Sequence, residues 1–211
     1  MERLPDPPSA AEILLKPPPD RRVLPVGTLL WRVFLEGGPH PVRWNEFRSF
    51  GPTASRFDHH PVDPPPRVHP GHGIMYAADL YSAACAEFFQ AGGAINRIYN
   101  KPWLVQFALA ETLTMIDLTG GWMIRAGGNA AIASGDREQA RKWSRVFHEA
   151  WPDIDGICYR SSLNPQWLAF ALYERAARAI PPTPLLHAPL TDSRLAPLIA
   201  NAVAETGYEL V

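Results

Sequence analysis

Proline most limits how this chain of 211 residues can fold, because its 23 prolines are gathered in a few segments. Proline interrupts helices and central strands, so such segments cannot hold regular structure for long. The first segment, residues 1–24, is predicted to be an arm around one short helix, which Ser9 and Glu12 begin as a capping box. The second lies between Arg56 and Tyr76 and reads FDHHPVDPPPRVHPGHGIM. Irregular loops of that length are often functional.

The rest of the chain contains the predicted strands and helices. Helices are expected from Leu80 to Ala91 with Asp79 as N-cap, from Asp136 to about Ala150, and over 193–205. Clusters of strand-forming residues predict strands at 27–34, 73–78, 103–111, 112–118, 155–162 and 167–174. Strands and helices do not alternate regularly, which favours an α+β fold with a mixed or antiparallel sheet over a doubly wound parallel sheet. The hydrophobic content of 46% suits a single domain over residues 25–211 behind the N-terminal arm.

Charge and apolar content exclude several classes of protein. The chain has 20 Lys and Arg residues and 21 Asp and Glu residues, so it carries no overall positive charge. Direct binding of nucleic acid is therefore not indicated. No apolar run is long enough to span a membrane, and the N-terminus does not resemble a signal peptide. Cys85 and Cys158 both lie in apolar runs, which is typical of reduced core cysteines. We therefore expect a cytoplasmic protein.

The common catalytic and binding motifs are absent from the sequence. GHGIMY lacks the third glycine of the dinucleotide-binding fingerprint and precedes a strand, where the fingerprint requires a helix. No phosphate-binding P-loop and no G-x-S-x-G nucleophile motif occurs. The histidines of the proline-rich loop match no common zinc spacing, so no metal site is expected there; they are His59, His60, His69 and His72.

One carboxylate, Glu87, stands in a helix that is otherwise apolar or small. On the pattern of this helix alone, a solvated glutamate at the border of a buried face is the favoured interpretation. Ala83 and Ala84 lie one turn back on the helix surface, however, and leave room for a ligand to approach the carboxylate. Arg32 stands in the apolar strand LLWRVF, where a charge must be paired or must meet a ligand.

Five segments in a fixed order resemble the RES domain: LLWRVF, SRF, GIMYAADLYSAACAEFF, GICYRSS and LAFALYE. The resemblance covers residues 27–174. RES domains are toxins of a bacterial toxin–antitoxin class whose antitoxins are Xre-like. The resemblance implies a compact ADP-ribosyltransferase-like fold and NAD as the substrate. Some members degrade NAD by phosphorolysis, and others transfer its ADP-ribose to a protein.

The resemblance also implies which residues form the site. The arginines of the family match Arg32 and Arg56, its tyrosine matches Tyr76 and its glutamate matches Glu87. Its late serine matches Ser161, with Ser162 as the alternative because the serine is doubled here. The implied catalytic residues are Glu87, Arg32 and Tyr76; the implied NAD- or phosphate-binding residues are Arg32, Arg56, Tyr76, Ser161 and Ser162.

These residue types suit cleavage of the nicotinamide–ribose bond. Positive charge develops on the ribose in the transition state, and a carboxylate such as Glu87 stabilises it. Guanidinium forks such as Arg32 and Arg56 bind a pyrophosphate well. The expected activity is that of an NAD-cleaving glycosyl transferase that needs no resident cofactor, with inorganic phosphate as co-substrate.

Two alternatives remain open at this point. Protein mono-ADP-ribosylation shares the first bond-breaking step with phosphorolysis and differs only in the attacking group. A catalytically inactive binding module is the alternative from another class of protein. The expected partners are an Xre-like antitoxin and a second copy of the chain, because the apolar residues Ile13 to Leu15 and the tryptophans would permit a homo-oligomer. The unusual length of the loop over residues 57–73 puts the acceptor group in doubt, and leaves the NAD chemistry unaffected.

Overall fold

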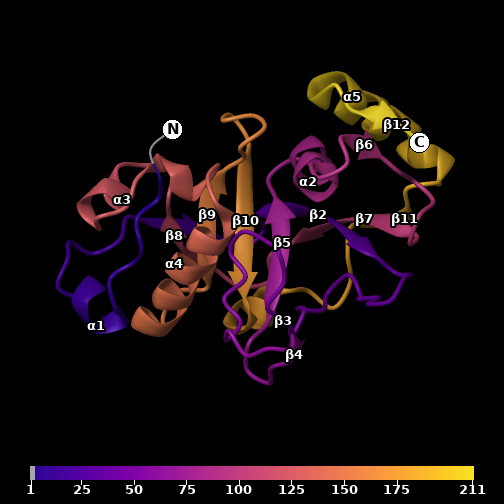
Figure 1. The fold of residues 1–211 in the computed structure, drawn as a ribbon. Coiled ribbons are helices and arrows are strands. Elements are labelled where there is room, and N and C mark those ends of the chain that lie inside the picture. The colour runs from indigo at the N-terminus through magenta and orange to yellow at the C-terminus, as the bar shows by residue number, and fades with distance from the viewer. Residues whose placement is uncertain (1–2) are drawn as a thin grey trace.

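The computed structural model describes residues 3–211 and contains one large mixed sheet with helices packed against it (Figure 1). The strand order is β1-β8-β9-β10-β5-β2-β7-β11, and every neighbouring pair is antiparallel except β8 and β9. The strands of this sheet are β1 (Arg21–Leu24), β2 (Leu29–Leu35), β5 (Ile74–Ala78), β7 (Pro102–Ala108), β8 (Leu113–Asp117), β9 (Gly156–Arg160), β10 (Leu168–Tyr173) and β11 (Leu186–Pro189). The predicted α+β fold with a mixed sheet is confirmed.

Two short ladders and a set of helices complete the fold. The first ladder pairs β3 (Phe50–Gly51) with β4 (Arg67–Val68), and the second pairs β6 (Ala94–Ile95) with β12 (Glu209–Leu210). The helices are α1 (Ala10–Ile13), α2 (Tyr81–Phe89), α3 (Trp122–Arg125), η1 (Ala130–Ile132), α4 (Arg137–Ala150), η2 (Glu174–Ala179), η3 (Ser193–Leu195) and α5 (Ala196–Thr206). No helix of the described chain combines the length and the apolar content needed to cross a membrane.

Helix α4 forms where its sequence predicts it. The Asp136 side chain accepts a hydrogen bond from the backbone of Gln139 at 2.9 Å, which caps the first turn. Trp143 and Phe147, one turn apart, are fully buried against the half of the sheet that contains β8, β9 and β10. Figure 1 shows α1 beside α4 at this end of the molecule, and α2 with α5 at the other end.

Helix α2 begins differently from the prediction. Its N-cap is Leu80, with no side-chain capping bond. Asp79, the expected cap, instead exchanges hydrogen bonds with Leu168: its backbone N–H donates to the Leu168 carbonyl at 3.1 Å, and its Oδ1 accepts from the Leu168 N–H at 3.2 Å. Asp79 therefore fixes the start of β10 against the end of β5.

The N-terminal segment contains one element that the sequence did not indicate. Ser9 and Glu12 form the expected capping box of α1. The last four residues of the proline-rich segment, Arg21–Leu24, form the edge strand β1 and pair with β8. The short helices α3 and η1 also form in a stretch expected to be a loop.

The core lies on both faces of the sheet. Along β5, Ile74 and Tyr76 face the cluster beneath α4, while Met75 and Ala77 face the cluster on the opposite side. Cys85 and Cys158 are free and buried, and burial raises the pKa of both thiols to about 12. The expectation that both cysteines are core residues is confirmed.

Candidate active site

A cavity opens in the sheet where β2 and β5 separate. These neighbouring strands pair only at Trp31 and Ala78. At its other end β5 pairs with a different segment, because Ile74 exchanges two backbone hydrogen bonds with Arg48, at 2.9 and 3.1 Å. Residues of β2, β5 and α2 line the resulting cavity of about 360 Å³. That volume lies within the range of roughly 300–1,000 Å³ typical of small-molecule sites.

Glu87 lies in the wall of this cavity, on the face of α2 that turns toward β9. Its Oε1 accepts a hydrogen bond from the Ser161 hydroxyl at 2.6 Å, and its Oε2 accepts one from the Tyr159 hydroxyl at 3.3 Å. Ser161 is itself buried and also accepts a hydrogen bond from the Leu163 backbone at 3.2 Å. Two donors from one segment, β9 and the turn after it, thus fix the orientation of the carboxylate.

Two tyrosines stand beside the carboxylate. Burial and the charge of Glu87 raise the pKa of Tyr159 well above its usual value, so its hydroxyl stays protonated and donates. Burial also raises the pKa of Tyr76 above its usual value. The Tyr76 hydroxyl is buried near the Ser55 side chain and the Phe57 backbone, but no residue between 3 and 211 meets it with the geometry of a hydrogen bond. Such a group is suited to a ligand in the cavity, because a buried polar atom without a partner costs free energy.

Positive charge predominates in the wall of the cavity. Four arginines line it, whereas Glu87 is the one carboxylate among the described lining residues; the arginines are Arg32, Arg48, Arg56 and Arg137. Arg48 forms an ion pair with the buried Asp58 at 2.9 Å, which offsets part of this charge. The remaining excess of guanidinium groups suits an anionic ligand such as a diphosphate.

Arg32 is buried and bonded to the loop that follows β2. Its Nη1 donates to the carbonyls of Trp44 and Glu46, at 2.8 and 3.0 Å. Burial lowers the pKa of Arg32 to about 10, so the guanidinium remains charged at neutral pH. Along β2, Arg32 alternates with Trp31 and Val33, which belong to the core cluster beneath α2. Arg32 therefore projects from the face of β2 that turns away from α2, and it orders the loop over the cavity.

Arg56 lies on the opposite rim, between the proline-rich loop and the start of α4. Its Nη1 donates to the Gly135 carbonyl at 2.7 Å. Burial and the neighbouring Arg137 lower the pKa of Arg56, while Tyr159 and Glu87 act in the opposite direction. Arg56 is thus close enough to Glu87 for their charges to interact across the cavity.

The structure brings together most of the residues expected to form the site. Arg32, Arg56, Tyr76 and Glu87 all line the cavity. Ser161 adjoins it through its hydrogen bond to Glu87. The next serine in the chain, Ser162, is exposed and is not part of the lining. Of the two consecutive serines, Ser161 is therefore the one that lies at the site.

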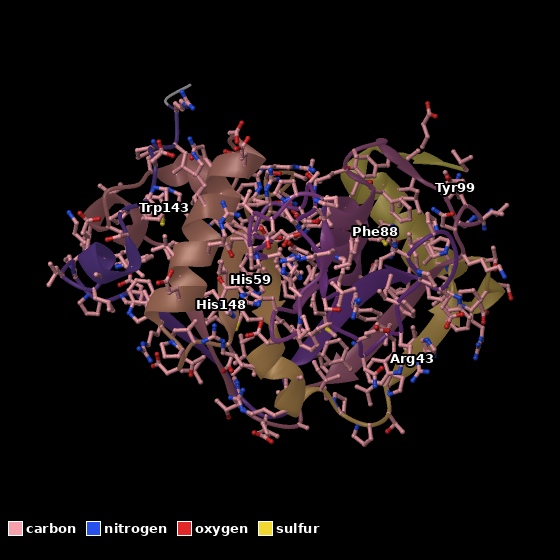
Figure 2. The ribbon with its side chains drawn as sticks, turned by 60° about the horizontal axis from the view of Figure 1, so that its bottom comes forward. Arg43, His59, Phe88, Tyr99, Trp143 and His148 are labelled. Carbon is pink, nitrogen blue, oxygen red and sulfur yellow. The ribbon has the colours of Figure 1, made fainter. Side chains whose placement is uncertain are left out.

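Several lining residues were not identified from the sequence. Tyr159 lies in the apolar strand β9, and nothing in the sequence indicated that it contributes to the site. Alternation along the strand places it on the same face as Ile157 and opposite Cys158. Arg137 directly follows Asp136, the N-cap of α4. This pattern indicates the start of a helix and gives no indication that Arg137 lines a site. Phe88, labelled in Figure 2, is 38% exposed and lies on the rim beside Glu87.

Comparisons with known proteins give a family match and one structural likeness. The family model described as RES domain matches residues 29–191, which is most of the chain. A solved structure titled "Crystal structure of the M.tuberculosis MbcT-MbcA toxin-antitoxin complex" is similar with a TM-score of 0.49 and 15% sequence identity, over 77% of this chain and 86% of the other. No curated protein matches the sequence.

Proposed function

This chain belongs to the RES domain family, and on that premise we propose that it is a toxin that cleaves NAD between nicotinamide and ribose. The acceptor that we propose is inorganic phosphate, so the products are nicotinamide and a phosphorylated ADP-ribose. The observation that carries the proposal is the single oriented carboxylate, Glu87, in a cavity to which four arginines also contribute.

The charges of the site fit this reaction. The bond between the nicotinamide nitrogen and the ribose carbon breaks, and its electron pair neutralises the cationic nicotinamide ring. Nicotinamide therefore leaves as a neutral molecule and needs no general acid, so one carboxylate suffices where glycosidases use two. Positive charge remains on the ribose, and Glu87 is the group in the cavity that stabilises it.

The arginines supply the sites for phosphate groups. Arg56, from the loop after β3, and Arg137, at the start of α4, line the cavity that contains Glu87, and they can bind the pyrophosphate of NAD or an incoming phosphate ion. A phosphate oxygen then bonds to the ribose carbon from which nicotinamide has left. Arg32 acts differently in this proposal: it holds the loop of Trp44 and Glu46 over the cavity.

The first experiment measures nicotinamide release from NAD by the purified chain, with and without inorganic phosphate. We expect release that accelerates with phosphate, together with a product whose mass is that of ADP-ribose plus phosphate. Release that ignores phosphate would favour hydrolysis, or transfer of ADP-ribose to a protein, as in the alternative activity of the family. No release under either condition would favour an inactive binding module and overturn the proposal.

The family also suggests the cellular setting. We propose an Xre-like antitoxin as the partner that blocks the cavity, the cytoplasm as the place of action, and a homo-oligomer in the complex. The tryptophans give no support for the oligomer, because Trp143 and Trp151 pack in the core against Phe147. Co-expression with an adjacent antitoxin gene and measurement of cellular NAD would test this setting.

The doubled serine offers an internal comparison of two neighbouring variants. Ser161→Ala removes the donor to Glu87 Oε1, so the carboxylate keeps only one of the two hydrogen bonds that orient it. We expect NAD turnover to fall about tenfold, the effect of one hydrogen bond of about 1.4 kcal/mol. Ser162→Ala is the matched control and should leave turnover unchanged, because its side chain is exposed. Equal losses in both variants would contradict the assignment of Ser161.

A further inference from the structure

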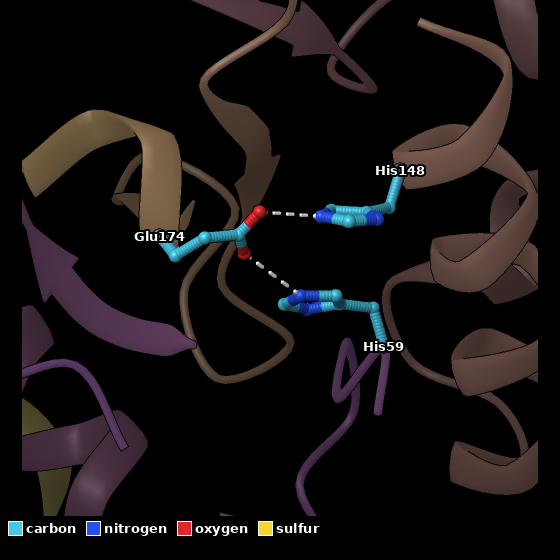
Figure 3. Close-up of side chains that lie close together, drawn as sticks. All are labelled: His59, His148 and Glu174. Atoms are coloured by element: carbon cyan, nitrogen blue, oxygen red, sulfur yellow. Dashed lines mark hydrogen bonds and ion pairs between the residues drawn. The ribbon is translucent and has the colours of Figure 1, made fainter. Parts of the chain in front are cut away.

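The proline- and histidine-rich loop, residues 57–73, contributes to a second cluster of side chains outside the cavity. His59 of this loop lies beside His148 near the end of α4 and Glu174 at the start of η2 (Figure 3). In Figure 2 the two histidines lie together and apart from Phe88, which marks the rim of the candidate active site. The cavity at Glu87 and the depression at His59 share no lining residue.

Both imidazoles of the cluster point at the same carboxylate. His59 Nε2 lies 3.2 Å from Glu174 Oε2, and His148 Nε2 lies 2.7 Å from Glu174 Oε1. The two rings stack with their centroids 4.2 Å apart, so both nitrogens approach from one side. All three potential ligand atoms lie within 4.8 Å of one another. Three segments distant in the sequence thus bring their ligand atoms together.

This donor set is one that transition metals use. Imidazole nitrogen with one carboxylate suits zinc and its neighbours, and two histidines with one glutamate are the protein ligands of several zinc enzymes. Zinc binds such nitrogen and oxygen atoms at about 2.0–2.2 Å, so ligand atoms of one site stand roughly 3.3 Å apart. His59 and His148 approach different oxygens of Glu174, at 3.2 and 2.7 Å, and no two of the three ligand atoms are more than 4.8 Å apart, so rotation of these side chains is sufficient to reach that spacing.

The surroundings also permit an ion to enter. The cluster borders an open depression of about 620 Å³, and His148 is partly exposed there. The charged groups lining it besides Glu174 are Glu149, Arg145 and Arg175. The Nη atoms of Arg175 already donate to the carbonyls of Trp151 and His148 at 3.1 and 3.0 Å, while its Nε lies 3.9 Å from Glu174 Oε1. The carboxylates balance the arginines, so no net positive charge repels a cation.

We propose that His59, His148 and Glu174 bind one divalent transition-metal ion of the zinc class. The ion joins the proline- and histidine-rich loop to α4 and η2. Because this loop lies between Arg56 and Tyr76, the ion fixes the segment that connects two residues of the candidate active site. His72 lies nearby, with its ring centroid 5.4 Å from that of His148, but it is not one of the three residues whose ligand atoms lie together. Spacing within the loop could not predict this site, since two of its ligands come from other segments.

The test uses the tag-free chain of 211 residues, stripped with a chelator and then titrated with Zn²⁺ by calorimetry. We expect one ion per chain and a rise of about 5 °C in the unfolding temperature at saturation. Titration with Co²⁺ should give the visible absorption bands of a four-coordinate site with nitrogen and oxygen ligands. Absence of saturable binding, or binding of several ions without a change in the unfolding temperature, would overturn the proposal.

Variants locate the site. His148→Gln and Glu174→Gln each remove one ligand, and both positions are partly exposed, so the fold should tolerate the change. We expect each variant to weaken Zn²⁺ binding about 100-fold. His187→Gln is the matched control, because His187 packs on Trp103, far from the cluster in the sheet order. Equal affinity in all three variants would assign the binding to other histidines and would contradict the proposal; circular dichroism of each apo variant confirms its fold.

Discussion

Glu87→Gln should reduce the turnover number for nicotinamide release from NAD by about 100-fold or more, with little change in KM. The substitution keeps the size of the side chain and removes the negative charge that, in the proposed mechanism, stabilises the ribose. Electrostatic groups aimed at transition-state charge contribute roughly 10²–10³ in rate. KM changes little because the arginines, and not Glu87, bind the phosphate groups in the proposed mechanism. Steady-state kinetics with detection of nicotinamide by chromatography measures both constants.

The control for this substitution is another Glu→Gln change. Glu205 lies exposed on α5 and is not among the residues that line the cavity. Glu205→Gln should retain the turnover number of the unmodified chain. Comparable unfolding temperatures of the two variants would show that the loss belongs to the chemistry. A Glu87→Gln protein that kept more than half of the turnover number would exclude Glu87 as the charge-stabilising group.

The helix that carries Glu87 could be predicted from a local pattern, whereas the assignment of Glu87 to the site came from the five ordered segments that resemble the RES domain. A charged residue in a helix of alanine and aromatic residues is visible within one helical turn. The same holds for α4, where the cap Asp136 and the apolar spacing of Trp143 and Phe147 are close together in the chain. Local patterns of this kind do not depend on how distant segments pair.

The two partners of Glu87 depend on such distant pairing: Ser161 was named only through the resemblance to the RES domain, and Tyr159 was not named at all. Tyr159 donates to Glu87 because β9 lies two strands from β5 in the sheet, beside β10. Tyrosine is common in buried strands whether or not it contacts a carboxylate, so its presence in β9 does not indicate this contact. For Arg32 the sequence did indicate that a partner is needed, because a charge stands in an apolar strand. The partners are the backbone carbonyls of Trp44 and Glu46, and no pattern of side chains reveals them.

The separation of β2 from β5, which forms the cavity, also has no sequence signature. It depends on Arg48 pairing with Ile74 in place of β2. The segment around Arg48 contains no run of strand-forming residues, so local propensity gives no reason to expect it beside β5. The sequence therefore indicated which residue types the site contains, whereas tertiary structure decided that they surround one cavity.

The largest loss of stability is expected for Gly156→Ala. Gly156 begins β9 in the middle of the sheet, paired with Met115 of β8 and Leu172 of β10. A Cβ atom there would lie against the Ala171 carbonyl oxygen, 2.7 Å from Met115 Cε and 3.0 Å from Leu172 Cα. Two of these three atoms belong to the backbone of β10, which cannot retreat without breaking its pairing with β5.

We therefore expect Gly156→Ala to reduce the free energy of unfolding by about 3 kcal/mol, which lowers the unfolding temperature by roughly 10 °C in a chain of this size. Gly92→Ala is the matched control: its Cβ would meet no atom within 4 Å, so its effect should stay within about 0.5 kcal/mol. Thermal and urea unfolding measure both. Strand β9 also carries Tyr159 and leads to Ser161, the two donors to Glu87. In a Gly156→Ala protein that still folds, β9 must move away from β10, and this movement separates both donors from Glu87. Such a protein should therefore turn over NAD more slowly. Equal stability of the two alanine variants would mean that β9 and β10 lie farther apart at Gly156 than the structure places them.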